Sequence, residues 1–345
     1  MHDRLLFHAE RFGLVMVDPT LFTVERRRHG RGHRICFAGG EAITDRRLKA
    51  RIKALVLPPA WRDVRICVEE NGHIQATGRD EKGRIQYRYH EAWVNVRNAV
   101  KTERLLRFGR ALPTLRERLE ADMKRNADDE RATAAVAARL IDHSAMRPGH
   151  EKYAEDGGRG VASLRRENLR LGEKRAVLKF VGKSHQTNVV EIEDRQLVRS
   201  LERMKSGRSK RLFRFTGSDL KRHDLTANIL NRYLRSASGK RISAKDFRTF
   251  HGSAEALRFL LEDVSAAERD TLPKRRRAVA KAMRSVSTVL RNTPTVARAS
   301  YVHPEIVTAF EEERLSPNLL RGRAREGLTS VETGLMRFLE ETAQA

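Results

Sequence analysis

The sequence predicts an α+β protein with a small, strand-rich N-terminal domain and a larger, mainly helical C-terminal domain. Up to about residue 90, short runs rich in Val, Ile, Phe and Thr alternate with turn residues, as in antiparallel strands. From about residue 91, apolar residues recur with helical spacing. A chain of 345 residues is also long enough for about two domains. We therefore expect domains at 1–90 and 91–345.

The N-terminal elements follow from apolar runs and the turn signals between them. We expect strands near 14–24, 33–37, 63–69 and 73–77, and an amphipathic helix near 44–54. Asn71-Gly72 separates the last two strands, and both residues tolerate positive φ. This pair predicts a two-residue hairpin turn.

Helical periodicity continues through most of the second domain. Candidate helices lie near 91–101, 103–122, 129–143, 195–205, 219–234, 244–264, 272–290, 294–310 and 329–342. The apolar runs AVLKF and NVVEI interrupt this pattern and flank a Gly-Lys-Ser turn, which predicts a β-hairpin over 176–192. The turn resembles the end of a phosphate-binding loop, but Val177 stands where that motif needs glycine, so we expect no ATP site. The helical C-terminal segment, about 30 residues, shows no pattern that assigns it a role.

Positive charge is spread along the whole chain. Lys and Arg number 70 against 45 Asp and Glu, a formal net charge of +25 at pH 7. A distributed excess of this size predicts a polyanionic partner, usually nucleic acid. A ribosomal or merely adhesive basic protein would have the same composition, so charge alone does not choose between these classes.

Other features limit the kind of site and the compartment. Cys36 and Cys67 are too few for a disulfide framework or a four-ligand zinc site, and no carboxylate cluster resembles a magnesium site. No apolar stretch approaches the roughly 20 residues that span a bilayer, and the N-terminus lacks a signal-peptide core. We expect a cytoplasmic protein without membrane contact, metal or cofactor.

Five runs, taken in order, carry a family resemblance. They are LPPAWRDVRICVEENGHIQATGRDEKGRIQYRYHEAW (57–93), IDHSAMRPGHEKYAE (141–155), LKFVGKSHQTNVVEI (178–192), ISAKDFRTFHGS (242–253) and LRNTPTVARASYVHPEI (290–306). The first resembles the N-terminal signature of bacterial type IB DNA topoisomerases related to the poxvirus enzymes, and the others resemble that family's successive catalytic motifs. The resemblance implies two domains that close as a clamp around double-stranded DNA. We therefore expect a nucleoid-associated monomer.

The resemblance also implies five catalytic positions. Tyr301 matches the family nucleophile, and Arg147 and Arg248 match two arginines that hold the nonbridging oxygens of the scissile phosphate. Lys183, at the predicted hairpin turn, matches the lysine that protonates the departing 5′ oxygen. Asn292 occupies the fifth position, where poxvirus members carry histidine. His251 and His303 lie nearby in sequence, and no role is assigned to them.

The residues around Tyr301 and Asn292 refine these roles. Thr293 suits a helix cap and Pro294 a first helical position, while Pro304 follows Tyr301 by three residues. Tyr301 should therefore lie near a kink or a helix end. Asn292 cannot shuttle a proton near neutral pH, but its amide can donate a hydrogen bond to an oxyanion. A helix N-cap is the alternative role for this residue.

The segment RIQYRY resembles the family's N-domain contact with the DNA groove. Arg84, Gln86, Tyr87 and Tyr89 combine aromatic rings with groups that suit base edges and sugar–phosphate walls. The alternative is a half-buried junction between a strand and a helix, in which the tyrosines only pack.

The function implied by the resemblance is relaxation of supercoiled duplex DNA. It would proceed through cleavage of one strand, a 3′-phosphotyrosyl intermediate, strand rotation and religation, without ATP or an obligatory metal. One alternative is a tyrosine recombinase, which usually has a helical N-terminal DNA domain rather than a strand-rich one. The other is a basic DNA-binding protein without chemistry, which would not require the five ordered catalytic positions.

Overall fold

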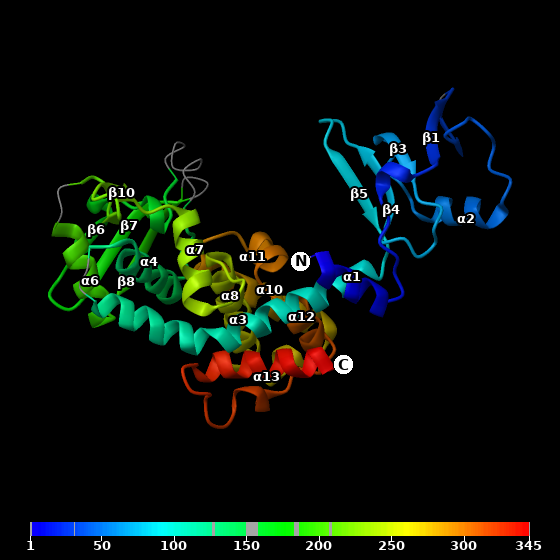
Figure 1. Cartoon of the computed structure of the whole chain (residues 1–345). Coiled ribbons are helices and arrows are strands. Elements are labelled where there is room, and N and C mark those ends of the chain that lie inside the picture. Colours follow the sequence, from blue (N-terminus) through cyan, green and yellow to red (C-terminus); the bar gives the residue numbers. More distant parts are fainter. Residues whose placement is uncertain are drawn as a thin grey trace. The chain divides into compact units, whose positions relative to one another are not determined.

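The computed structural model describes residues 2–30, 32–125, 128–149, 158–182, 186–206 and 209–344. The chain forms two compact units, Met1–Lys101 and Thr102–Ala345 (Figure 1). Unit 1 is built around a β-sheet and unit 2 is mainly helical, so the predicted α+β class is confirmed.

Unit 1 contains a five-stranded antiparallel sheet in the order β2-β1-β3-β4-β5. Its strands are β1 (Val24–His29), β2 (Gly32–Phe37), β3 (Arg62–Ile66), β4 (Ile74–Arg79) and β5 (Ile85–Tyr89). Helix α2 (Arg46–Ala54) starts at Asp45, whose side chain accepts hydrogen bonds from the first turn. Ile52 of α2 is buried in one cluster with Val24, Val64 and Ile66 of the sheet. This apolar contact fixes α2 on the sheet.

Two predictions for unit 1 are wrong in detail, and one helix was missed. Helix α1 (His2–Arg11) was not predicted, and 14–24 is not a strand because a 3-10 helix occupies Pro19–Leu21. Asn71-Gly72 does not form a two-residue turn, since β3 ends at Ile66 and β4 begins at Ile74. The Asn71 amide instead donates to the Gly13 carbonyl (3.2 Å), and its carbonyl accepts from Val15 (2.9 Å). Asn71 thus holds residues 13–15, the segment that follows α1.

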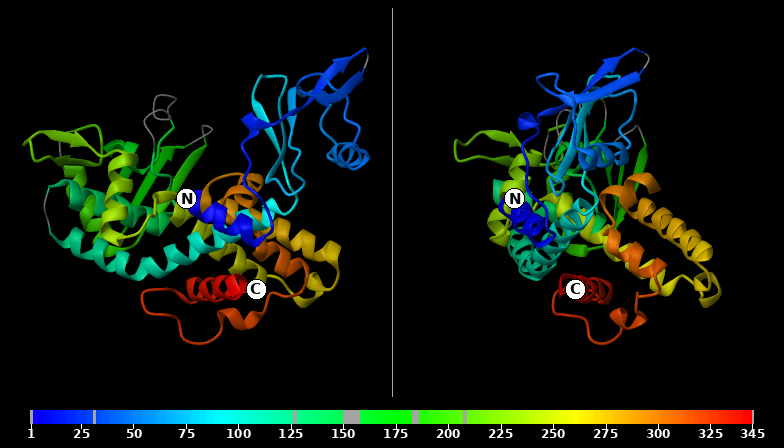
Figure 2. Two further views of the ribbon diagram at one scale, coloured as in Figure 1. Left: turned by 45° about the vertical axis from the view of Figure 1, so that its right-hand side comes forward. Right: turned by 90° about the vertical axis from the view of Figure 1, so that its right-hand side faces the viewer.

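The helices of unit 2 follow the predicted order, but the single helix expected over 294–310 is wrong: it is broken into two helices, because the chain turns between Ser300 and Pro304. Helix α3 (Trp93–Lys124) begins in unit 1 and is continuous where two helices were expected. The others are α4 (Glu130–Ser144), α6 (Arg195–Ser206), α7 (Ala227–Ser238), α8 (Ala244–Glu262), α9 (Ala266–Arg269), α10 (Leu272–Leu290), α11 (Pro294–Ser300), α12 (Pro304–Glu311) and α13 (Ser330–Gln344). Helix α13 packs against α8, and it lies beside α3 in every view (Figures 1 and 2).

Two small sheets lie in unit 2. Strands β6 (Leu169–Leu171), β7 (Ala176–Val181) and β8 (Thr187–Ile192) form one sheet. Strands β7 and β8 are antiparallel: Ala176 lies opposite Ile192 at one end, and Val181 lies opposite Thr187 at the other. Strands β9 (Arg214–Thr216) and β10 (Arg222–Asp224) form the other. The predicted helix 219–234 is therefore wrong at its start, and α7 begins only after Thr226 caps it.

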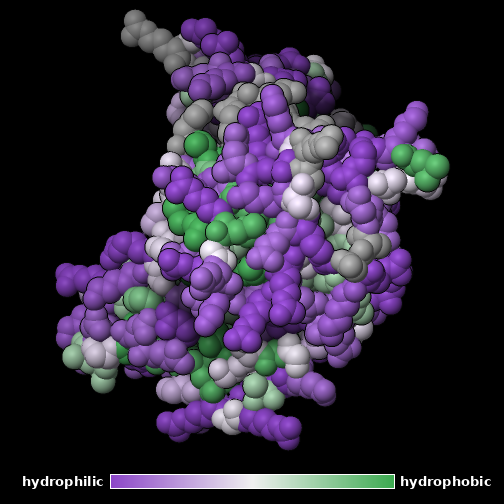
Figure 3. All heavy atoms as spheres, turned by 90° about the vertical axis from the view of Figure 1, so that its left-hand side faces the viewer, coloured by the Kyte–Doolittle hydropathy of each residue, from purple (hydrophilic) through white to green (hydrophobic). Residues whose placement is uncertain are grey.

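The core of unit 2 joins helices that are distant in sequence. Leu115 of α3, Leu140 of α4, Phe247 and Phe250 of α8 and Leu335 of α13 are fully buried in one cluster. The face of unit 2 that carries β6, α6 and β10 is mostly hydrophilic, as the charge of the chain requires (Figure 3).

Candidate active site

Tyr301 lies at the corner between α11 and α12. Thr293 caps α11 by accepting from the Val296 amide (3.3 Å), Pro294 follows at the first helical position, and Tyr301 ends the helix with φ −126°. The predicted helix end is confirmed. On α8, a Cβ placed on Gly252 would lie 3.3 Å from the Tyr301 Cβ, so only a glycine leaves this contact unstrained. The tyrosine is half-buried and held close to α8.

Arg248 of α8 lies against the Tyr301 ring. Its guanidinium carbon is 4.7 Å from the ring centroid, and the side chain is 2% exposed. Two of its hydrogen bonds go to backbone carbonyls at the C-terminal ends of two helices, Ala145 after α4 and Leu290 of α10 (3.0 Å). These carbonyls carry the partial negative charge of a helix terminus and favour a cation. Burial lowers the pKa of Arg248 to about 10, so the group remains charged at neutral pH.

Arg147 reaches the same region from the segment after α4. Its Nη1 donates to the Arg291 carbonyl (3.2 Å), and its own carbonyl accepts from Val161 (2.9 Å). Gly149 in the same MRPGH motif has φ +81° and packs directly on Gly160. A side chain at either glycine would push the segment that carries Arg147 away from its place.

Asn292 follows α10 and directly precedes the cap of α11. Thr293 is the N-cap, so the alternative that Asn292 caps this helix is wrong. Both polar atoms of the Asn292 amide are buried and have no hydrogen-bond partner among the described residues. An unpaired buried amide costs about 1–3 kcal/mol, which suits a group that awaits a ligand.

The cations around Tyr301 change its acidity. Burial alone would raise the pKa of the Tyr301 hydroxyl, but Arg248, and then Arg147 and Lys245, outweigh that effect and lower it below its ordinary value. A lowered pKa makes the phenolate, the nucleophilic form, easier to reach.

Arg291 is a site residue that the sequence analysis missed. It ends α10 with φ 51°, an unusual conformation for a residue with a side chain. Its carbonyl accepts from Arg147, and its Nη1 donates to the Ser144 carbonyl (2.7 Å). No spacing pattern distinguishes it from the other arginines of this chain; its only signal is its place beside Asn292.

Lys183 lies outside the described residues, between the ends of β7 and β8. His303 is fully buried, caps α12 by accepting from Glu305 (3.3 Å), and its Nε2 lies 2.9 Å from the Thr102 hydroxyl. The Nε2 atom of His251 lies 3.4 Å from Oδ1 of Asp142.

The candidate DNA contacts of unit 1 lie on the edge strand β5. Tyr87 and Tyr89 are 45% and 41% exposed and stack on each other, and Tyr89 also stacks on Trp93, with centroids 5.9 Å apart in both pairs. Arg84 and Gln86 both bond to Asp80, at 2.7 and 3.0 Å. The tyrosines therefore pack as a stack that still has an open face.

Within the described residues, no group of three or more His, Cys, Asp or Glu side chains could hold a metal ion. In the same part of the chain, no helix combines the length and the apolarity needed to cross a membrane.

Comparison with known proteins gives two family matches and one relative. Residues 90–316 match the model of the eukaryotic DNA topoisomerase I catalytic core, and residues 33–80 match that of the bacterial DNA topoisomerase IB N-terminal domain. The DNA topoisomerase 1B of Acanthamoeba polyphaga mimivirus is 28% identical over 248 residues, which cover 70% of this chain and 72% of the relative. All five expected catalytic positions lie within the first match.

Proposed function

The chain belongs to the type IB DNA topoisomerase family and is a DNA topoisomerase, and on that premise we propose that Tyr301 is its nucleophile. The Tyr301 oxygen attacks a backbone phosphate of one strand, and the bond to the 5′ oxygen breaks. A 3′-phosphotyrosyl bond forms in its place. The free 5′ end rotates around the intact strand and then attacks the phosphotyrosine, which reseals the DNA.

One observation carries this proposal: the buried Arg248 guanidinium lies 4.7 Å from the Tyr301 ring, and among the described residues it bonds backbone carbonyls and Tyr301 but no carboxylate. A phosphate that meets the Tyr301 oxygen would therefore meet an uncompensated positive charge. Arg248 and Arg147 would hold its nonbridging oxygens, and one such donor is commonly worth ~10²–10³ in rate.

Asn292 is proposed to complete the pocket for these oxygens. Its amide is buried without a partner among the described residues and follows Arg291 directly in the chain. An amide N–H can donate to a phosphate oxygen and cannot act as an acid, so its role is contact and not proton transfer.

Lys183 is proposed as the general acid on the 5′ oxygen. The support is its match to the family motif between β7 and β8. Replacing the bridging 5′ oxygen by sulfur tests this role, because a thiolate departs without a proton. The Lys183→Ala variant should cleave normal DNA more slowly than wild type does. It should cleave the sulfur substrate almost as fast as wild type does. An equal defect on both substrates would remove Lys183 from this role.

We also propose that Arg84, Gln86, Tyr87 and Tyr89 contact the DNA groove, since β5 is an edge strand whose tyrosines keep an open face.

The expected assembly is a monomer that acts on nucleoid DNA. The energy of the broken bond is kept in the phosphotyrosine, so the reaction should need neither ATP nor an obligatory metal.

Plasmid relaxation in EDTA without ATP, followed by a denaturing gel, tests the proposal. Wild type should relax supercoils of both signs and form a covalent protein–DNA adduct. Tyr301→Phe should bind DNA normally and form no adduct. Activity that vanishes in EDTA and returns only with magnesium would refute the metal-independent chemistry. An adduct in Tyr301→Phe would refute the nucleophile.

A further inference from the structure

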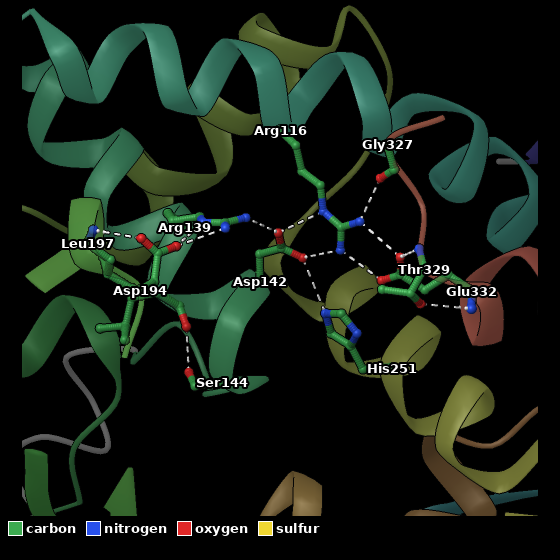
Figure 4. A network of polar contacts seen from close by, with 11 residues as sticks. Arg116, Arg139, Asp142, Ser144, Asp194, Leu197, His251, Gly327, Thr329 and Glu332 are labelled. Atoms are coloured by element: carbon green, nitrogen blue, oxygen red, sulfur yellow. Dashed lines mark hydrogen bonds and ion pairs between the residues drawn. The ribbon is translucent and has the colours of Figure 1, made fainter. Parts of the chain in front are cut away.

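A buried network of charged side chains connects the C-terminal helix to the end of α4 (Figure 4). At its centre, Arg116 of α3 bonds two carboxylates at once. It donates to Asp142 of α4 at 2.9 and 3.0 Å and to Glu332 of α13 at 2.7 and 2.9 Å. It also donates to the Gly327 carbonyl at 2.8 Å. Both carboxylates are almost completely buried, at 2% and 6% exposure.

Asp142 lies in the last turn of α4, directly before the carbonyls that hold the active-site arginines. The Ser144 carbonyl accepts from Arg291 (2.7 Å), and the Ala145 carbonyl accepts from Arg248. The positions of these two carbonyls therefore depend on how the last turn of α4 is held. Asp142 is the charged residue of that turn that the network fixes.

Glu332 is fixed in turn by the start of α13. Its side chain accepts from the Thr329 amide (2.9 Å), and the Thr329 hydroxyl accepts from the Glu332 amide (3.2 Å). This reciprocal pair is a capping box, so Glu332 cannot move without disturbing the helix start. The segment lies beyond residues 90–316, the part that matches the family's catalytic core.

We propose that Glu332 and Arg116 are positioning residues for DNA cleavage: through Asp142 they hold the end of α4 where its carbonyls orient Arg248 and Arg291. The proposal rests on the role of Arg248 given above. It assigns an indirect contribution to catalysis to the C-terminal segment that carries Glu332. A displacement of the order of 1 Å at a group that orients a reactant can cost ~10² in rate, so a small shift of α4 is enough.

Glu332→Gln tests the proposal, because it removes the charge and keeps the shape. Its matched control is Glu340→Gln on the same helix. Glu340 also bonds an arginine with both oxygens, Arg325 at 3.0 and 2.7 Å, but this pair does not reach α4. Single-turnover cleavage of a duplex should slow about tenfold in Glu332→Gln, because a shift of less than ~1 Å at the orienting carbonyls should cost less than ~10² in rate. Glu340→Gln should cleave at the wild-type rate, and both variants should bind duplex DNA with unchanged affinity.

A second comparison separates positioning from a general loss of structure. If Glu332 acts through Arg248 and Arg291, then Glu332→Gln should slow Arg248→Ala by a smaller factor than it slows wild type, and the two defects will not fully multiply. Fully multiplying defects, or a wild-type cleavage rate in Glu332→Gln, would overturn the inference. Should Glu332→Gln fold poorly, Glu332→Asp keeps the charge with a shorter reach and should be slowed less than the Gln variant; an equal or greater defect overturns the inference. A wild-type cleavage rate in Arg248→Ala alone would instead show that the proposed active site is wrong. That result is distinct from a failure of the positioning role of Glu332.

Discussion

Two groups of buried or half-buried arginines lie around the end of α4, and they differ in their partners. Arg147, Arg248 and Arg291 bond to backbone carbonyls, and among the described residues no carboxylate pairs with any of them. Arg116 and Arg139 instead bond to Asp142, Asp194 and Glu332 (Figure 4). Carbonyls orient a guanidinium without cancelling its charge, whereas carboxylates neutralise it. The first group therefore keeps its charge, which we propose serves to hold a phosphate, and the second uses its charge to hold the fold.

The difference should appear most strongly in stability. Arg116→Met leaves Asp142 and Glu332 as buried carboxylates without their main partner. We expect the free energy of unfolding to fall by about 3–5 kcal/mol, which is typical of breaking a buried ion pair. Denaturant titration measures the free energy of unfolding of Arg116→Met and of a control variant, Arg325→Met. Arg325 pairs with Glu340 nearer the surface, so its loss should change stability by less than about 1 kcal/mol. Equal losses in the two variants would contradict the distinction.

Arg248→Met should show the opposite pattern. It removes the charge beside Tyr301, so we expect single-turnover cleavage to slow by ~10²–10³, equivalent to about 2.7–4 kcal/mol. Its effect on unfolding should be smaller than that of Arg116→Met, because no carboxylate is left unpaired. Cleavage on an oligonucleotide duplex and denaturant titration of the same preparation provide both values. A variant that unfolds easily yet cleaves at the wild-type rate would place Arg248 in the structural group.

Local sequence signals predicted much of the catalytic side of this comparison. Thr293, Pro294 and Pro304 placed Tyr301 at a helix end, because caps and prolines act over a few residues. The motifs around Arg147 and Arg248 pointed to two arginines whose charges lower the pKa of Tyr301; their roles in catalysis stay predictions. Arg291 was missed because a positive φ at a helix end leaves no signal when the residue is not glycine.

The structural group could not be predicted, for a physical reason. Arg116 lies 26 residues from Asp142 and 216 from Glu332, and only the packing of α3, α4 and α13 brings the three together. Periodicity predicts that each helix exists and not which faces meet. The β9–β10 hairpin was missed for a related reason: each strand has three residues, too few for an alternating pattern.

We propose Asn292 for the catalytic side, and because it carries no charge, its effect on cleavage should be smaller than that of Arg248. Asn292→Ala removes the amide that would contact the phosphate, and we expect cleavage to slow by about 10². Asn292→His should keep substantial activity, because imidazole can also donate to an oxygen. Single-turnover cleavage by both variants tests this. Wild-type rates in Asn292→Ala would show that the unpaired amide does not serve catalysis.

The smallest expected effect is on the pH dependence of stability, and it should arise on the structural side. Burial alone would raise the pKa of Glu332, but Arg116 outweighs it, and the pKa lies below its ordinary value. A carboxylate with a lowered pKa stabilises the fold above its unfolded-state pKa, and this contribution is lost as the pH falls through the folded-state value. The unfolding free energy of wild type should therefore decrease between neutral pH and pH values below the ordinary value of 4.5.

Glu332→Gln removes that titrating group, so its stability should decrease less steeply over the same range. Arg248→Met provides the contrast within the comparison: Arg248 stays protonated throughout acid and neutral pH, and its loss should leave the acid slope as in wild type. Denaturant titrations at several pH values measure the three slopes. If the unfolding free energy of Glu332→Gln falls as steeply with decreasing pH as that of wild type, the ion pair with Arg116 does not hold Glu332 ionised in the folded protein. A changed slope in Arg248→Met would mean that the two arginine groups are coupled in charge as well as through α4.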